Sequence, residues 1–242
     1  MKILLTDCST LQSNNDLDLS VFDQFGKTVK YENITRAELL HEAVDADIIL
    51  SNKTVIDKEV FSVAKNLKYI GLFATGYNNI DIIEAKNRNI PVCNAGSYST
   101  NAVAQQVIAY ILMHFTKVSE YNSFVKDGGW KRSPLFSSLV FTSDEVFGKT
   151  LGIVGFGSIG KAVKKAAEAL GMKVIVNTRT VKEDGETVFV SLDTLLKTSD
   201  IITVHCPLNE QSADMFNSET FEKCKVGAFF INTARGGVVD EN

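Results

Sequence analysis

The residues with the clearest chemical potential form a glycine-rich turn between an apolar strand and a helix. The sequence LGIVGFGSIG, from Leu151 to Gly160, contains the pattern G-x-G-x-x-G. Leu151 to Val154 have the composition of a buried parallel strand, and Ser158 to Leu170 predict a helix. Such a turn offers backbone N–H groups and the positive end of a helix dipole to an anion, which is typical of a dinucleotide pyrophosphate site. A tight turn without a ligand is the alternative.

Each glycine of the pattern has an expected task. Gly155 permits the tight turn, and Gly157 leaves room for a pyrophosphate beside bare backbone. Gly160 allows helix and strand to pack closely. The sequence GMKVIV, from Gly171 to Val176, supplies the next strand and completes a βαβ unit. The residues predicted to bind a dinucleotide here are Gly155, Phe156, Gly157, Ser158, Ile159 and Gly160.

The end of the second strand indicates which dinucleotide binds. An NAD site of this type usually carries Asp or Glu there, which hydrogen-bonds the ribose hydroxyls. Here the strand continues into Asn177, Thr178, Arg179 and Thr180, without an acid. Arg179 and the threonine hydroxyls would attract a 2′-phosphate that a carboxylate would repel. This favours NADP, with NAD possible; alternatively, Arg179 is a solvated loop residue and Asn177 or Thr178 bonds the ribose.

Composition bounds the class of protein. Of 242 residues, 45% are hydrophobic and 22% charged, as in globular proteins with a substantial core. The formal net charge of −4 argues against nucleic acid or an anionic membrane as the main partner. The apolar start is too short for a signal peptide, and no segment is long enough to span a membrane. The four cysteines form no C-x-x-C pair, so we expect reduced thiols, no metal site and a cytoplasmic protein.

Alternating strands and helices predict an α/β domain in the first hundred residues. Apolar runs of strand length alternate with helical patterns, and Thr35 with Glu38 forms a capping box. The expected strands are Lys2–Thr6, Asp47–Leu50, Leu67–Leu72 and Ile90–Cys93, and the expected helices are Thr35–Val44, Ile56–Lys65 and Ile80–Asn89. This alternation implies a doubly wound parallel sheet.

The remaining residues predict a second domain of the same class. A long apolar helix, Thr100–Tyr121, precedes a turn-rich connection, Lys126–Pro134, and an irregular stretch, Leu135–Phe147. A helix that is apolar on more than one face usually packs in an interior or against a second subunit. Further strands are expected at Lys173–Asn177, Thr187–Val190, Ile201–His205 and Ala228–Asn232. We therefore expect two doubly wound α/β domains, 1–98 and 99–242, the second a Rossmann domain, with a ligand crevice where the carboxyl ends of their strands face each other.

Four segments together resemble the D-isomer-specific 2-hydroxyacid dehydrogenases, and within them the hydroxypyruvate reductase or glycerate dehydrogenase branch. The segments are ATGYNNID at 74–81, the glycine pattern at 155–160, HCPL at 205–208 and INTARGGVVDE at 231–241. The combination is specific, because unrelated Rossmann proteins share only the glycine pattern. Trp130, the RSP at 132–134 and the Phe-rich loop that follows are also similar to the glycerate dehydrogenase branch.

The resemblance implies an activity and a substrate site. It implies a homodimer that reduces a small 2-oxo acid, such as hydroxypyruvate or glyoxylate, to the D-2-hydroxy acid with NAD(P), residues 1–98 being a flavodoxin-like substrate-binding domain. Arg235 matches the family's substrate arginine, whose planar guanidinium can grip a carboxylate and polarise the carbonyl. Thr75 and Gly76 match the loop whose backbone N–H groups bind the substrate carboxylate. A surface arginine and a bare glycine turn are the respective alternatives.

The resemblance also implies positions that line the cofactor. The matching residues are His205, Cys206, Pro207, Ser212, Thr233 and Ala234. His205 is thus not expected to be the catalytic base, and Cys206 is expected to be an inert wall residue rather than a nucleophile. Lys53, just past a strand, could help to hold an anion, or it is simply a solvated lysine.

The chain departs from the family pattern in its last part. In relatives the proton donor is a His oriented by a Glu, and both follow the arginine motif, as does a segment that completes the first domain; all would lie beyond Asn242. We therefore expect a fragment of a longer enzyme, or else a truncated product, with negligible turnover alone. Two other functions stay open: a catalytically inert dinucleotide-binding regulator, against which Arg235 and Thr75 argue, and a relative such as a formate dehydrogenase, whose elaborated polar loop is not found.

Overall fold

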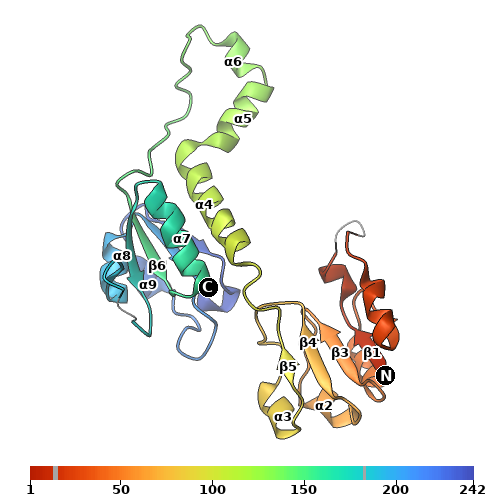
Figure 1. The fold of residues 1–242 in the computed structure, drawn as a ribbon. Helices are drawn as coiled ribbons and strands as arrows, with labels where there is room; N and C mark the ends of the chain where they lie inside the picture. The colour runs from red at the N-terminus through yellow and green to blue at the C-terminus, as the bar shows by residue number, and fades with distance from the viewer. Residues whose placement is uncertain (13–15, 182–183) are drawn as a thin grey trace. The chain divides into compact units, whose positions relative to one another are not determined.

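The fold consists of two units, each built around its own parallel sheet (Figure 1). The structure, a computed structural model, describes residues 1–12, 16–181 and 184–242. Contacts divide the chain into Met1–Tyr98 and Ser99–Asn242. All registered strand pairs are parallel. The predicted α/β class with two doubly wound parallel sheets is confirmed.

The sheet of the first unit has five strands in the order β2-β1-β3-β4-β5. The strands are β1 (Lys2–Leu5), β2 (Lys27–Lys30), β3 (Ile48–Ser51), β4 (Tyr69–Leu72) and β5 (Val92–Cys93). Four of them match predicted strands. The sequence does not predict β2, because KTVK contains a single apolar residue. β2 is an edge strand, where lysines discourage pairing with a further chain.

Different elements cover the two faces of this sheet. Leu4 of β1 packs into the core beneath three α-helices, whereas Ile3 and Leu5 pack toward Leu19 and Phe22 on the opposite face. The helices are α1 (Arg36–Ala43), α2 (Lys58–Val63) and α3 (Ile82–Asn87), with 3-10 helices η1 (Cys8–Thr10) and η2 (Leu19–Phe25). The sheet is therefore buried on both faces, as parallel sheets require.

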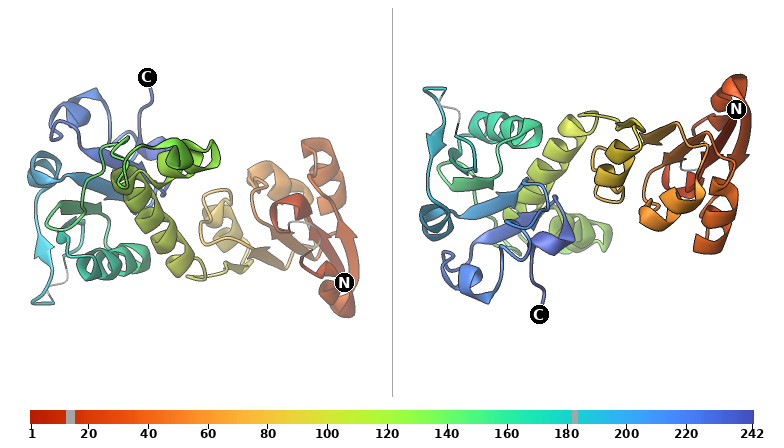
Figure 2. Two further views of the ribbon diagram at one scale, coloured as in Figure 1. Left: turned by 90° about the horizontal axis from the view of Figure 1, so that it is seen from above. Right: turned by 90° about the horizontal axis from the view of Figure 1, so that it is seen from below.

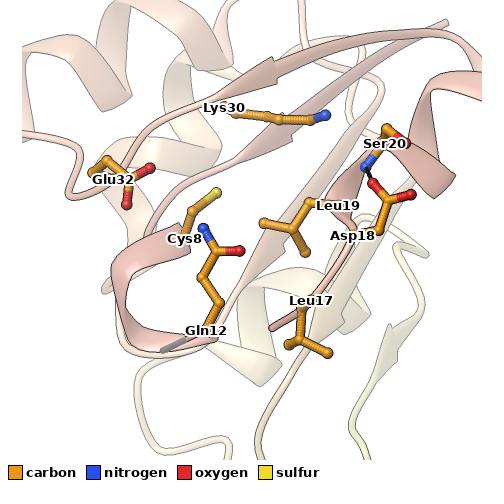
Figure 3. A pocket seen from close by; sticks show the side chains of 8 residues that line it. All are labelled: Cys8, Gln12, Leu17, Asp18, Leu19, Ser20, Lys30 and Glu32. Atoms are coloured by element: carbon orange, nitrogen blue, oxygen red, sulfur yellow. Dashed lines mark hydrogen bonds between the residues drawn. The ribbon is translucent and has the colours of Figure 1, made fainter. Parts of the chain in front are cut away.

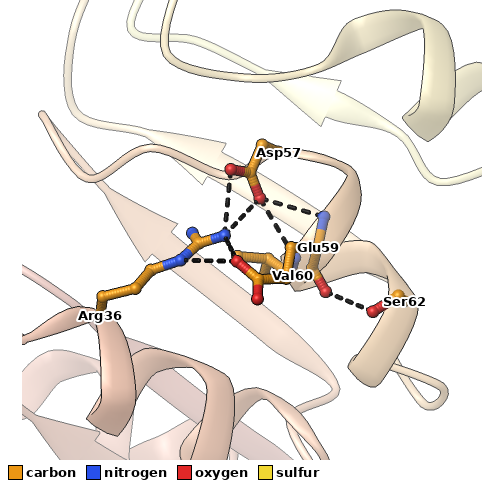
Figure 4. Close-up of polar contacts among 5 residues, drawn as sticks. All are labelled: Arg36, Asp57, Glu59, Val60 and Ser62. Atoms are coloured by element: carbon orange, nitrogen blue, oxygen red, sulfur yellow. Dashed lines mark hydrogen bonds and ion pairs between the residues drawn. The ribbon is translucent and has the colours of Figure 1, made fainter.

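Side-chain caps fix where the helices of the first unit begin, and at α2 the capping residue Asp57 also pairs with Arg36 (Figure 4). The carboxylate of Asp57 caps α2 by accepting hydrogen bonds from two N–H groups in the first turn of that helix. Arg36 Nη2 donates to Asp57 Oδ1 at 2.7 Å and also to Glu59. The predicted capping box of α1 is confirmed, since Thr35 N donates to Glu38 Oε2 at 2.8 Å. Because the caps fix these starts, α2 and α3 begin two residues later than predicted.

The sheet of the second unit has the order β10-β9-β6-β7-β8. Its strands are β6 (Thr150–Val154), β7 (Lys173–Asn177), β8 (Val188–Phe189), β9 (Ile201–Val204) and β10 (Phe229–Asn232). Its helices are α4 (Thr100–Thr116), α5 (Val118–Lys126), α6 (Gly129–Arg132), α7 (Ser158–Ala169), α8 (Leu192–Thr198), α9 (Ser218–Glu222) and the 3-10 helix η3 (Gly236–Val238). All five predicted strands are confirmed, with ends shifted by a residue or two.

Helices lie on both faces of this second sheet (Figure 2). Ile111 of α4 and Val163 of α7 pack into one core with Ile153 of β6. Leu195 of α8 packs into the other core with Val204 of β9. The predicted βαβ unit is confirmed, because β6 pairs with β7 along its whole length and α7 connects them.

Two helical predictions are wrong. The single helix expected from Thr100 to Tyr121 is broken at Lys117, whose φ of 56° and ψ of 33° are left-handed. Thr116 Oγ1 donates to the Leu112 carbonyl at 2.6 Å, a bond that competes with helix continuation. The expected turn-rich connection 126–134 instead contains α6. Residues 135–147 are irregular, as predicted.

Candidate functional site

The turn between β6 and α7 has a geometry that only glycine permits at two positions. Gly155 has a φ of +94°, and a Cβ there would lie 2.6 Å from the backbone N of Cys206. A Cβ on Gly160 would lie 2.4 Å from the carbonyl oxygen of Gly155. Neither contact leaves room for a side-chain carbon. The turn, the start of α7 and the chain after β9 are therefore packed backbone against backbone.

Gly157 has a different environment, because a Cβ built on it would meet open space. Gly157 is the N-cap of α7, and no described side chain caps this helix. The first N–H groups of α7 are therefore left for a ligand or solvent. A helix N-terminus of this kind attracts anions through its N–H groups and its dipole. The turn fits a pyrophosphate, since bare backbone, free donors and space coincide.

A cavity of about 530 Å³ extends from this turn past the ends of β7 and β9. Its volume lies within the range of small-ligand sites. The predicted cofactor residues in its wall are Gly155, Phe156, Gly157, Asn177, Thr178, Arg179, Thr180, His205, Cys206, Pro207 and Ser212. Ser158, Ile159 and Gly160 form the first turn of α7, next to the lining residue Gly157, and are not themselves among the lining residues. Thr233 and Ala234 instead border a separate hollow beside Arg235.

The end of β7 presents a cation and an unpredicted carboxylate. Arg179 is exposed, and its Nη1 donates to Gln211 Oε1 at 3.5 Å. Asp184 also lines the cavity, but its oxygens accept bonds from Thr187 Oγ1 and Thr187 N, each at 2.8 Å. The bond from the Thr187 hydroxyl is the main cause of the lowered pKa of Asp184. Asn177 donates from Nδ2 to the Val190 carbonyl at 3.0 Å.

His205 and Cys206 form an uncharged part of the wall. His205 Nε2 lies 3.0 Å from Thr203 Oγ1, and its Nδ1 lies 3.4 Å from Thr233 Oγ1. Burial lowers the pKa of His205 to about 4. Burial also raises the pKa of the Cys206 thiol, which keeps it protonated. Neither residue is therefore suited to proton transfer or nucleophilic attack at neutral pH.

Ser212 shapes the cavity wall through bonds within its own turn. Its side chain is buried, and its Oγ donates to the Pro207 carbonyl at 2.6 Å and accepts from Asn209 N at 2.9 Å. Asn209 Oδ1 in turn accepts from Gln211 N at 2.9 Å. Residues 207–212 are thus a hydrogen-bonded turn, in which the Ser212 hydroxyl is already engaged.

Arg235 follows β10 on a loop braced by Asn232. Asn232 Nδ2 donates to the Arg235 carbonyl at 2.9 Å, and its Oδ1 accepts from Ala234 N at 3.0 Å. The Arg235 side chain is exposed, and its Nη1 donates a hydrogen bond to the Ala234 carbonyl at 2.8 Å. With Thr233 and Ala234 it borders a hollow of about 520 Å³. Its other N–H groups can serve a carboxylate.

The Arg235 loop and the cavity wall are tied by backbone hydrogen bonds. Asp214 N donates to the Gly237 carbonyl and Phe216 N to the Val238 carbonyl, both at 3.0 Å. Phe216 is fully buried, which anchors this connection in the core. The segment after β9 therefore supports both the cavity and the arginine.

In the first unit, Thr75 and Gly76 lie on the loop after β4. Thr75 Oγ1 donates to the Gly96 carbonyl at 2.6 Å, and Asn94 Nδ2 donates to the Thr75 carbonyl at 2.7 Å. Thr75 is exposed and Gly76 half-buried. These bonds fix the course of the loop and leave its outer surface accessible.

The position of Lys53 is fixed by a hydrogen bond from its backbone N–H group and not by its side chain. The buried carboxylate of Asp7 accepts hydrogen bonds from Asn52 N, Lys53 N and Thr54 N. The Lys53 residue is exposed. This arrangement fits the simpler interpretation of a solvated lysine on a loop that Asp7 fixes in place.

A further hollow of about 430 Å³ lies beside η1 and η2 (Figure 3). Its wall mixes Lys30 with Asp18 and Glu32, and Asp18 already accepts from Ser20 N at 2.8 Å. Its mixed charges favour no ligand class.

Two further kinds of site are absent from the described residues. No group of three or more His, Cys, Asp or Glu side chains in them is placed to hold a metal ion. Across the same part of the chain, no helix combines the length and apolarity needed to cross a bilayer.

Sequence reasoning missed part of the cavity wall. The unpredicted lining residues are Val154, Lys161, Asp184, Asn209, Gln211 and Met215. Val154 and Lys161 flank the glycine pattern, and that adjacency was a usable signal. The others come from loops after β7 and β9, whose course depends on tertiary packing.

Comparison with known proteins identifies relatives over the whole chain. The family model described as D-isomer specific 2-hydroxyacid dehydrogenase, NAD binding domain, matches residues 108–242. A hydroxypyruvate reductase from Blautia hydrogenotrophica is 36% identical over 247 residues, covering 100% of this chain and 76% of the relative.

Two solved structures share the fold and carry dinucleotides. An acyclic imino acid reductase in complex with NADPH and D-Arg has a TM-score of 0.85 and 28% identity, covering 100% of this chain and 76% of that one. A D-lactate dehydrogenase from Aquifex aeolicus, complexed with NAD and lactic acid, has a TM-score of 0.85 and 29% identity, covering 98% and 70%. The two complexes differ in their dinucleotide, so they do not decide between NAD and NADP for this chain.

The depressed pKa of His205 predicts a pH-dependent stability. Unfolded histidine binds a proton near pH 6.5, but folded His205 does so only near pH 4, so stability falls as the pH drops through this window. This group should make the free energy of unfolding about 2 kcal/mol lower at pH 5 than at pH 7. Urea unfolding of wild type and His205→Asn at both pH values measures this. An equal change in both proteins would contradict the assignment.

Proposed function

The chain belongs to the D-isomer-specific 2-hydroxyacid dehydrogenases, a family of oxidoreductases, and from this premise we propose that it serves the reduction of a small 2-oxo acid by binding the acid and, in the cavity of the second unit, a dinucleotide. The observation that carries the proposal is the open space at Gly157 beside the uncapped start of α7. In this proposal Ser99–Asn242 is the dinucleotide-binding unit and Met1–Tyr98 the substrate-binding unit.

The cofactor is proposed to lie along the 530 Å³ cavity. Backbone N–H groups of Ser158 and Ile159 would bind its pyrophosphate, since no described side chain caps them. Residues 177–180 would surround the adenine ribose, and the uncharged His205 and Cys206 would line the cavity. When bound, a reduced nicotinamide supplies the hydride that a 2-oxo acid needs. The chain's own residues bind, orient and polarise the partners of that transfer.

Arg235 is proposed to bind the substrate carboxylate and polarise its carbonyl. One N–H of its guanidinium is engaged with the Ala234 carbonyl, which leaves others for a bidentate contact. The Asn232 brace and the Asp214 tie limit the movement of its backbone. In the first unit, Thr75 and Gly76 are proposed to bind substrate through their backbone N–H groups.

The substrate class is proposed to be that of hydroxypyruvate and glyoxylate. This chain is similar over all of its own length to the hydroxypyruvate reductase from Blautia hydrogenotrophica. We propose negligible turnover for residues 1–242 alone, because their histidines are poorly suited to donate a proton. His205 is neutral and engaged with threonines, and His114 stacks on Phe229 at 4.1 Å. His41 lies on α1.

A catalytically inert dinucleotide-binding regulator is the second candidate. The braced loop that holds Arg235 argues for the enzyme, because a regulator has no use for an exposed guanidinium on a hydrogen-bonded loop.

We propose that a second copy of this chain covers the arm formed by α5, α6 and the loop after them. Figure 1 shows these elements running away from the sheet of their own unit. Their large apolar side chains are strongly exposed, including Phe136 at 98%, Leu139 at 91% and Leu135 at 69%. A patch of this kind is typical of a protein interface.

The substrate role of Arg235 predicts a selective loss. Arg235→Ala should weaken the binding of a 2-oxo acid to the dinucleotide-bound protein by about 100-fold or more, because the carboxylate loses its bidentate partner. The affinity for the dinucleotide should stay within about twofold, since Arg235 lies outside that cavity. Calorimetric titration with each ligand measures both affinities and needs no turnover. Parallel losses of 2-oxo acid affinity and dinucleotide affinity would argue against the assignment.

We also propose that NADP is preferred over NAD, because the exposed Arg179 lines the cavity at the end of β7. In wild type, NADP should bind more tightly than NAD, and Arg179→Ala should weaken NADP about tenfold with little effect on NAD. Calorimetric titration of both proteins with both dinucleotides checks this. Equal affinities in wild type would remove the case for NADP.

The proposed dimer predicts the molecular mass of the protein in solution. Sedimentation equilibrium should give twice the chain mass of 26.6 kDa, and the double substitution of Phe136 and Leu139 by Glu should give a monomer. A monomeric wild type would refute the interface.

A further inference from the structure

We propose that Lys161 binds the 2′-phosphate of the dinucleotide and is a residue that determines the preference for the phosphorylated cofactor. The inference rests on the proposed dinucleotide site. Lys161 lies on α7, one residue after the glycine pattern, and lines the same cavity as Arg179 and Thr180. Side chains of an α-helix lean toward its N-terminus, so this position directs the ammonium group toward the ligand end of α7.

The position of Phe156 shows on which side of the turn Lys161 lies. The Lys161 Nζ lies 5.7 Å from the centre of the Phe156 ring, within the range of a cation–π contact. That ring packs edge-on against Phe189 of β8, with 5.7 Å between centroids. β8 is the edge strand next to β7, the strand whose end carries Arg179. Lys161 therefore lies toward the adenosine ribose end of the cavity.

The charge of the wall explains why a second cation is needed. Asp184 lines the same region, and its carboxylate is ionised because hydrogen bonds lower its pKa. Arg179 alone would only balance that charge, whereas Lys161 and Arg179 together give the lining residues that the structure describes a net charge of +1. His205 and Cys206 are uncharged at neutral pH. A net positive wall favours a doubly charged phosphate over a ribose hydroxyl.

Lys164 gives independent support for this placement of α7. The pKa of Asp184 is lowered mainly by the hydrogen bond from Thr187 and least by the charge of Lys164, which puts Lys164 on the same side of α7 as Asp184. Lys164 is itself paired with Glu168 at 2.9 Å. Lys161 forms no ion pair with a carboxylate of residues 1–12, 16–181 or 184–242, which leaves its ammonium group for a ligand.

The test is a binding titration with NADP and NAD, which differ only by the 2′-phosphate. Lys161→Ala should weaken NADP about tenfold and change NAD by less than about twofold. Lys161→Arg should keep most of the NADP affinity, because it keeps the charge. Lys165→Ala is the matched control: it removes the same charge one turn further along α7, outside the cavity wall, and should leave both affinities unchanged.

Each other outcome overturns the inference in a distinguishable way. Equal weakening of NADP and NAD by Lys161→Ala would place Lys161 on the pyrophosphate, and no weakening would make it a surface lysine. The same effect from Lys165→Ala would indicate a general field rather than a contact. If wild type bound neither dinucleotide, the proposed function itself would fail. Thermal unfolding of each variant confirms that the comparison is made between folded proteins.

Discussion

The backbone contact between Gly155 and the chain after β9 is the constraint on which the rest of the second unit depends. A side-chain carbon at Gly155 would overlap the His205–Cys206 peptide, and one at Gly160 would overlap the Gly155 carbonyl. These two close approaches fix the start of α7 against the sheet. Only because the helix is held this way does the open space at Gly157 face the uncapped N–H groups.

The segment after β9 connects the two parts of the proposed chemistry. Hydrogen bonds of Ser212 and Asn209 hold this segment in a turn that lines the cavity. The buried side chain of Phe216 fixes the end of the segment in the core. From there, backbone bonds run to the loop of Arg235. The proposed dinucleotide cavity and Arg235, the proposed substrate arginine, thus share one support, so a change in this segment should affect both. Hydrogen-bonded turns of this kind hold functional groups more precisely than free loops do.

Local signals explain what the sequence could predict. The βαβ unit follows from the glycine spacing and apolar strands, and the start of α1 follows from Thr35 and Glu38. Lys117 gives no such signal, since lysine is an ordinary helix residue and its left-handed backbone depends on its surroundings. Lys161 and Asp184 join the cavity only through the packing of α7 and the loop after β7. The roles of residues that depend on contacts between distant segments therefore could not be predicted from the sequence.

The central claim is that bare backbone at Gly157 admits a pyrophosphate. It is tested most directly by titrating Gly157→Ala with the dinucleotide and following its thermal unfolding. The fold has space for the added methyl group, so the melting temperature should change by no more than about 2 °C. The dinucleotide affinity should fall about tenfold or more, because the methyl group occupies the place of the phosphate. Unchanged affinity in a stable variant would contradict the account.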